Sequence, residues 1–227
     1  GTGMAPAEVV RVFQEGVGST LGLIVVVVGL GTMLGRLLAE SGGAAAIAHR
    51  LVASLGVRRL DWAVVLAAFV VGMPVFFAVG LVLLIPVVFT LARTSGTPML
   101  RLALPLLAGL SVCHTLVPPH PGPVVAVEKL GADMGGTILW AVAIGLPTAA
   151  IVGPLLATVL GRWITVAPGG LGAQLQATQP PPRPAGWAVS VGTILLPVAL
   201  MLFATLAVTS LPKGHPWLLR AGFLGSP

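Results

Sequence analysis

The sequence predicts an all-α, polytopic integral membrane protein. Hydrophobic residues make up 56% of its 227 residues, charged residues make up only 8%, and the mean hydropathy is +1.05. A typical soluble domain carries roughly 25% charged residues. The apolar residues also fall into long uncharged segments, of which about five have the length needed to cross a hydrocarbon core of about 30 Å.

The first predicted span covers residues 16–35, a run without charge that matches the bilayer in length. Residues 36–61 then place apolar residues at helical spacing among several arginines. This pattern predicts an amphipathic or re-entrant helix pair that is joined at 41–43 and stopped at Gly56. Because basic loops favour the cytoplasmic side, we expect this segment to face the cytoplasm.

Residues 62–92 form an uncharged segment that is too long for one straight span, since a helix of this length measures about 46 Å. Pro74 interrupts it between Gly72 and Gly80, and proline removes a helical hydrogen bond. We therefore expect a broken helix here. Broken backbone at membrane depth is tolerated where it is buried in protein or lines a wet cavity, and transporters build binding sites in this way.

The rest of the chain continues the pattern of spans. Pro147 and Pro154 predict kinks in the span that contains them. The Pro-rich stretch 174–186 is too polar for the bilayer and predicts an extended linker between spans. We expect residues 1–227 to form a single transmembrane domain. The remaining predicted spans are residues 102–127, 134–161 and 187–211.

The stretch 111–123, "SVCHTLVPPHPGP", places polar side chains inside an otherwise apolar segment. Its prolines predict extended backbone after Thr115, with carbonyl groups left unpaired. Water, an ion or a bound solute would satisfy those carbonyls, so a binding site is expected here. The polar side chains of this stretch are Ser111, Cys113, His114, Thr115 and His120.

His114 and His120 are the histidines of the apolar segments, and titratable residues inside a membrane are functional candidates. The unperturbed pKa of histidine, about 6.5, suits proton exchange near neutrality. We therefore predict a proton-coupling role, for His114 first and His120 second. The alternative is that the imidazoles only bind backbone carbonyls. Cys113 is expected to pack as a small apolar residue. Cys113, His114 and His120 have no fourth metal ligand near them in the sequence, so neither a metal nor another cofactor is predicted.

Several motifs together resemble the gluconate permease family of bacterial proton symporters. They are "GLGTMLGRLLAESGGA", "DWAVVLAAFVVGMPVFFAVGLVLLIPVVF", "LSVCH" with "PPHPGP", "GADMGGTILWAVAIGLPTAAIVGP" and "LPKGHPWLLRAGFLG". The resemblance implies uptake of gluconate or a related sugar-acid anion together with protons, by alternating access. It also implies a multi-pass protein of the bacterial inner cell membrane, not an enzyme.

Two departures from the family leave alternatives open. Members of that family are longer chains, so this chain resembles a piece that is incomplete relative to the family. Three alternatives follow. The chain is a working segment that assembles as a homo-oligomer, or an inactive fragment of such a permease, or a carrier for another small carboxylate. The family also tends to carry an acidic residue after the aromatic pair of the broken helix, where this chain has Ala78.

Binding of an anion needs positive partners, yet the long apolar segments hold no Lys or Arg. Helix N-termini, backbone amides near glycines, hydroxyl groups and protonated histidine are left for this task. Nucleic-acid binding is excluded because no basic stripe is present. Besides the histidines, four glycines are candidates for close approach of the backbone to the substrate, namely Gly42, Gly43, Gly80 and Gly122. Ser41, Ser111 and Thr115 are candidates for binding sugar hydroxyls. Glu40 either matches an acidic position of the family or caps the following helix.

Overall fold

The structure is a computed structural model that describes residues 3–164, 184–212 and 215–226. Every regular element in these ranges is a helix, and five helices are long and apolar enough to cross a membrane. The prediction of an all-helical, multi-pass membrane protein is confirmed. The linker predicted at 174–186 lies outside the described residues except for 184–186. The five candidate spans are Pro6–Glu40, Phe77–Ser95, Met99–Leu130, Met134–Leu160 and Trp187–Ser210.

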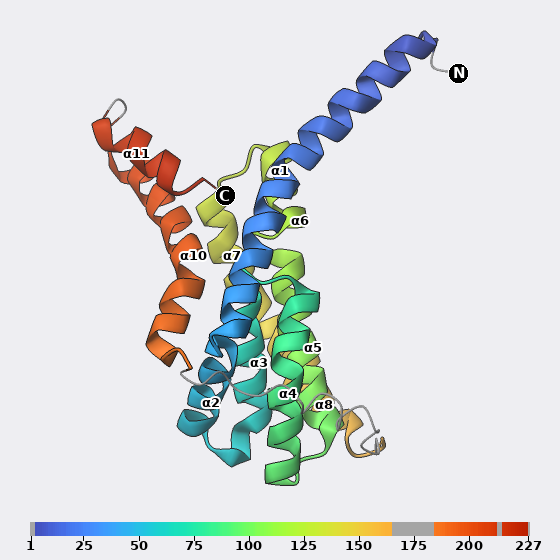
Figure 1. The fold of residues 1–227 in the computed structure, drawn as a ribbon, viewed down its shortest axis with the longest axis vertical. Coiled ribbons are helices and arrows are strands. Elements are labelled where there is room, and N and C mark those ends of the chain that lie inside the picture. The colour runs from blue at the N-terminus through green and yellow to red at the C-terminus, as the bar shows by residue number, and fades with distance from the viewer. Residues whose placement is uncertain (1–2, 165–183, 213–214, 227) are drawn as a thin grey trace.

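Helix α1 (Pro6–Glu40) is longer than the predicted span, and its first half projects away from the other helices (Figure 1). The chain then turns into α2 (Gly43–Leu55), which lies at the lower end of the bundle in this view. Gly42 has a φ of 69°, a left-handed conformation that side chains rarely adopt, so glycine permits this turn. Gly56 has a φ of 77° and its N–H bonds the carbonyl of Val52, which confirms the predicted stop.

Helices α3 (Leu60–Gly72) and α4 (Phe77–Ser95) form a hairpin. The predicted break around Pro74 is confirmed, but the chain reverses direction there instead of continuing as one kinked span (Figure 1). Glycines on both sides of the turn allow the two arms to approach α5: a Cβ added at Gly72 or at Gly80 would meet Leu110, at 3.2 and 2.8 Å. The hairpin therefore enters and leaves on the same side, and its turn lies inside the bundle.

Helices α5 (Met99–Leu116) and α6 (Pro121–Leu130) form one span with a break at 117–120. The predicted extended backbone is confined to these four positions, because Pro121 takes the first position of a new helix, where an N–H is not needed. The expectation of unpaired carbonyls is wrong at Val117 and His120, which accept hydrogen bonds from the N–H groups of His120 and Val124.

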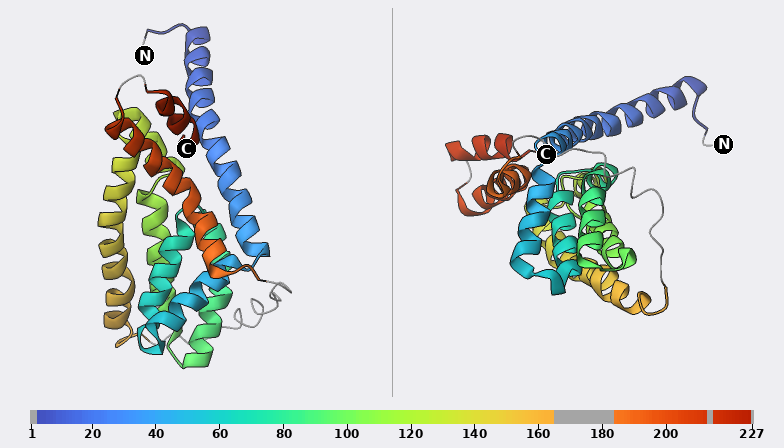
Figure 2. Two further views of the ribbon diagram at one scale, coloured as in Figure 1. Left: turned by 90° about the vertical axis from the view of Figure 1, so that its left-hand side faces the viewer. Right: turned by 60° about the horizontal axis from the view of Figure 1, so that its bottom comes forward.

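The next span descends as α7 (Met134–Ala150), a π-helical turn η2 (Ile151–Leu155) and α8 (Leu156–Leu160) (Figure 2). Pro154 lies in the π-helical turn, which is one of the ordinary ways in which a helix accommodates a distortion. Helix α10 (Trp187–Ser210) then returns to the other end, and α11 (Pro216–Leu224) follows it. The short 3-10 helix η1 (Val57–Arg59) connects α2 to α3.

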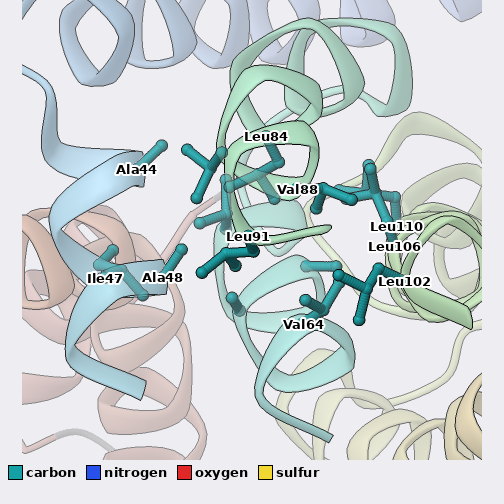
Figure 3. Packing of buried hydrophobic residues seen from close by; sticks show 14 of the residues in the cluster. Ala44, Ile47, Ala48, Val64, Leu84, Val88, Leu91, Leu102, Leu106 and Leu110 are labelled. Atoms are coloured by element: carbon teal, nitrogen blue, oxygen red, sulfur yellow. The ribbon is translucent and has the colours of Figure 1, made fainter. Parts of the chain in front are cut away.

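The core is centred on α3, which runs parallel to α5. Close approach of the two helices depends on Gly109 of α5: a Cβ added there would lie 2.7 Å from both the Cβ of Ala68 and the carbonyl oxygen of Val65. Leucine and valine side chains from α3, α4 and α5 fill the space between these helices and α2 (Figure 3). Cys113 is fully buried in a second apolar cluster, which confirms its predicted packing role.

Charged residues divide unequally between the two ends of the bundle. We call one end of the bundle the base; it carries α2, the start of α3 and the end of α4. The base holds most of the described cations and two acids, Glu40 and Asp61. The opposite end carries a nearly balanced set. The base cations are Arg36, Arg50, Arg58, Arg59, Arg93, Arg101 and Arg162; the opposite end has Arg11, Lys129 and Arg220 with Glu8, Glu15, Glu128 and Asp133.

Candidate functional site

The turn of the α3–α4 hairpin meets the α5–α6 break, and hydrogen bonds from two histidines link them. Nε2 of His120 lies 2.7 Å from the carbonyl oxygen of Gly72, at the end of α3. Nδ1 of His120 lies 3.1 Å from Nδ1 of His114, on α5. His120 is only 2% exposed, whereas His114 is partly exposed. The structure thus brings the two predicted histidines together and binds them to the hairpin.

Phe76, the last residue of the hairpin turn, packs its ring against both imidazoles. Its ring centre lies 5.7 Å from that of His114 and 5.9 Å from that of His120, with interplanar angles of 61° and 80°. These are edge-to-face arrangements, which aromatic rings favour. Phe76 therefore holds the orientation in which the two histidines share a hydrogen bond.

Four helix ends converge at this place. Helices α3 and α5 end at Gly72 and Leu116, and α4 and α6 begin at Phe77 and Pro121. The first turns of α4 and α6 present backbone N–H groups and the positive ends of two helix dipoles. In α4 the first backbone N–H bonded within the helix is that of Gly80, which donates to the carbonyl of Phe76. This arrangement can attract an anion without a cationic side chain.

A cavity of about 240 Å³ adjoins the hairpin turn and the break. Its wall is mostly apolar, and its polar side chains are His120 and Ser226. Three prolines also line it: Pro74 in the hairpin turn, Pro119 in the α5–α6 break and Pro197 inside α10. The other lining residues come from α1, α10 and α11 and from the turn: Val27, Leu30, Gly31, Leu34, Phe76, Leu196, Leu200, Met201 and Leu224.

Gly31 of α1 closes the cavity on the side of the hairpin turn. A Cβ added there would lie 3.1 Å from the carbonyl oxygen of Pro74 and 3.2 Å from Cε2 of Phe76. The absence of a side chain thus lets α1 contact the turn directly. Gly31, Gly72 and Phe76 were not among the site residues predicted from the sequence. The "GMPVFF" break indicated the neighbourhood, but the partner of each residue lies far away in the chain.

The hydroxyl and glycine candidates around the break lie apart from the cavity. Thr115 and Gly122 line a separate hollow of about 300 Å³ between α5, α6 and the start of α7. Ser111 is exposed on α5, and its carbonyl accepts a hydrogen bond from the Thr115 hydroxyl at 2.8 Å. The roles of Ser111 and Thr115 in binding sugar hydroxyls and of Gly122 in backbone approach stay predictions. Thr115 and Gly122 line a different hollow from His120.

The candidates from the α1–α2 turn lie at the base, away from the histidines (Figure 1). Glu40 forms an exposed ion pair with Arg36 and does not cap α2, so the capping alternative is wrong. The carbonyl of Ser41 accepts from the N–H of Ala185, and Gly43 packs against the side chain of Ser190. Together with the left-handed Gly42, these residues hold the turn against the start of α10.

Asp61, beside Trp62 in the first turn of α3, is a buried charged residue. Its side chain is 5% exposed and accepts from Nη2 and Nε of Arg101, at 3.3 and 3.4 Å. Arg101 lies in the first turn of α5, forty residues further along the chain. Sequence spacing cannot reveal such a pair, because it forms only when α3 and α5 run side by side.

A helical hairpin whose turn meets a broken span at a titratable site is the construction of secondary membrane transporters. Comparison of the sequence with known protein families assigns the chain to one family of transporters. It matches the family described as GntP family permease over residues 1–227, and it belongs to that family. The family consists of transporters and not of enzymes, as the resemblance implied.

Curated relatives agree with this assignment. The chain is 45% identical to the gluconate permease of Pseudomonas aeruginosa over 227 residues, and 42% identical to the high-affinity gluconate transporter of Escherichia coli over 226 residues. It is 36% identical to the D-serine transporter of Escherichia coli over 235 residues. These alignments cover 99 to 100% of this chain and 50 to 51% of the relatives, so the chain spans about half their length. No solved structure matches the chain.

Proposed function

We infer that this chain is part of a secondary transporter that moves gluconate or a related sugar-acid anion across the bacterial cell membrane together with protons. The observation that carries this proposal is the contact of the hairpin turn with the α5–α6 break through His114 and His120. The names of the relatives support the substrate class.

Recognition of the anion follows from the helix ends. The cavity is lined by no charged side chain among the described residues. We therefore propose that the carboxylate is attracted by the N-termini of α4 and α6 and by a proton on the histidine pair, of which His120 lines the cavity and His114 is its hydrogen-bond partner. Ala78 lies exposed in the first turn of α4 and places no negative charge at this helix end. An alanine there favours binding of an anion over repulsion, although it removes one possible proton carrier.

The polyhydroxy chain of a sugar acid needs more hydrogen-bond partners than this mostly apolar cavity offers. We therefore treat residues 1–227 as one transmembrane domain that is incomplete relative to the family. The further partners come from the rest of a full-length transporter or from a second copy of this chain. Alternating access would then move the hairpin turn relative to α1 and α10, which form the opposite wall of the cavity.

Orientation follows from the charge asymmetry. Cytoplasmic loops of membrane proteins carry an excess of Lys and Arg. The base, with its surplus of arginines, therefore faces the cytoplasm, and the protruding start of α1 faces the opposite side. We propose that the protein lies in the bacterial inner membrane, with the hairpin entering from the cytoplasmic side.

A chimera tests the proposal directly. The matched part of the Pseudomonas aeruginosa gluconate permease is replaced by residues 1–227 and produced in a bacterium that lacks gluconate uptake. We expect labelled gluconate to enter when an inward proton gradient is imposed and to enter poorly without one. Excess unlabelled L-idonate and D-serine then define the substrate range, since transporters of both are among the relatives.

The intact relative and a parallel strain that produces only the 227 residues are the controls. Uptake by the chimera and not by the isolated chain means that this half needs a second one. Uptake by both means that the chain works by itself, as a homo-oligomer. A chimera that reaches the membrane and yet takes up neither gluconate nor the competing carboxylates contradicts the proposal and favours an inactive fragment.

A further inference from the structure

The hydrogen bonds around the two histidines fix their tautomers. The carbonyl oxygen of Gly72 can only accept, so His120 must donate to it from Nε2. A neutral imidazole carries one N–H, which leaves Nδ1 of His120 as an acceptor. The 3.1 Å contact between the two Nδ1 atoms then requires that His114 donates from Nδ1. The bond direction therefore runs from His114 to His120 to Gly72.

This direction leaves one nitrogen open for a further proton. Nε2 of His120, Nδ1 of His120 and Nδ1 of His114 are all engaged, and in the described ranges no hydrogen bond is found at Nε2 of His114. His114 is also the more exposed ring, whereas His120 is 2% exposed. An incoming proton can bind the lone pair of Nε2 of His114 without breaking any existing hydrogen bond.

The surroundings add no competing charge. The hairpin turn presents Phe76 and a backbone carbonyl to the pair, and α5 presents Cys113, which faces the second apolar cluster. On α6 the charged residues are Glu128 and Lys129, more than two turns beyond His120. No ion pair within the described part of the chain involves either histidine.

We propose that His114 accepts the coupled proton at Nε2, and that His120 is a positioning residue that orients His114 and binds the hairpin through Gly72. Adding the proton turns His114 into an imidazolium, with no bond broken and one positive charge gained. A bound carboxylate neutralises that charge, so proton and anion are bound together. This assignment of roles rests on the proposed function for the transport step, whereas the tautomers rest only on geometry.

Nitrogen-15 NMR of histidine-labelled protein in liposomes tests the tautomers without transport. The imidazole ¹⁵N shifts distinguish protonated from bare ring nitrogens, and the spectra of His114→Gln and His120→Gln assign the signals. At high pH we expect His114 with a protonated Nδ1 and a bare Nε2, and His120 with the reverse. On acidification Nε2 of His114 should become protonated while Nδ1 of His120 stays bare. Protonation of Nδ1 of His120 before Nε2 of His114 overturns the proposal.

Matched glutamine variants in the chimera test the roles. At position 120 a glutamine amide can still donate to the Gly72 carbonyl and accept from His114, so His120→Gln should lower uptake but keep its dependence on the proton gradient. His114→Gln removes the proton acceptor, and its uptake should be the same with and without the gradient. The opposite result, gradient dependence lost in His120→Gln and kept in His114→Gln, contradicts the proposal.

The two experiments separate the failures. The histidine tautomers can be as expected while uptake by the chimera never responds to the proton gradient. That result leaves the proton site in place and refutes the proposed symport. Gradient-driven uptake combined with titration of His120 first refutes the proton site and leaves symport in place. Where one variant fails to fold, the spectrum of the other still assigns the signals of its own histidine, and the tautomer of that ring tests the proposal.

Discussion

Helix α3 is joined to the α5–α6 span by a polar contact at each of its ends, and the two contacts differ in kind. At the base Asp61 and Arg101 form an ion pair of full charges, with Arg101 44% exposed at the membrane surface. At the hairpin turn the contact is a histidine N–H bound to the carbonyl of Gly72. Charge is tolerated where water or headgroups reach it, whereas a site inside the bilayer relies on neutral groups and backbone.

The difference assigns a separate task to each end. The ion pair joins the start of α3 to the start of α5, so it fixes the position of the hairpin's base. The contact at the turn lies beside the cavity, and His120, which forms it, is hydrogen-bonded to His114, the proposed proton acceptor. An ion pair at one end and a hydrogen bond next to the proposed proton site at the other suit a movement of the hairpin turn during transport.

The largest effect is expected at Gly109, between the two ends, because both contacts depend on close packing there. Gly109→Leu places a side chain where even a Cβ would lie 2.7 Å from Ala68 and Val65. Overpacking of this kind costs about 1 to 3 kcal/mol, occasionally more. We expect a lower melting temperature in detergent and little protein in the membrane. The control is Gly29→Leu, because a Cβ at Gly29 meets nothing within 4 Å; equal losses in both variants would contradict the packing argument.

The base contact is tested by Asp61→Ala, which leaves Arg101 without its buried partner. Breaking a fully buried pair costs about 3 to 5 kcal/mol, and the exposure of Arg101 lowers this to about 1 to 3 kcal/mol. The melting temperature in detergent measures the loss. The double variant with Arg101→Ala should recover part of it, because no uncompensated charge remains. A double variant that is as unstable as the sum of both single ones would show that the pair does not act as a unit.

The turn is tested by Gly31→Ala, which adds a methyl group 3.1 Å from the carbonyl oxygen of Pro74 and 3.2 Å from the ring of Phe76. These contacts require small shifts of the turn, so we expect reduced gluconate uptake by the chimera with a nearly unchanged melting temperature. Gly29→Ala on the same helix serves as the matched control. Unchanged uptake in Gly31→Ala would remove this wall of the cavity from the binding site.

The smallest effect is expected for Glu40→Gln. The ion pair of Glu40 with Arg36 is highly exposed, at 61% and 78%, and exposed pairs contribute about 0.5 kcal/mol or less. Melting temperature and uptake should both stay close to wild type. A strong loss of uptake would return Glu40 to the functional site and would mean that the base takes part in transport.

Several structural features were predictable from the amino-acid sequence because they depend on local chemistry. Pro74 favours a helix break because proline removes a helical hydrogen bond, and Gly42 and Gly56 mark a turn and a helix end because both take positive φ angles. The histidines of the apolar stretch were selected because a titratable group is costly in a membrane. The extent of the break after Thr115 was overestimated, since a proline stops a preceding helix but also starts a following one, as Pro121 does.

The sequence by itself determined the class of the molecule, the number of its spans and the positions of its breaks, because hydrophobicity and backbone conformation are properties of single residues and short segments. Only the tertiary structure decided that the first break reverses the chain, that His120 bonds Gly72, and that Asp61 pairs with Arg101. These contacts join residues forty or more positions apart. They depend on which helices pack side by side, and shape complementarity at residues such as Gly109 decides that.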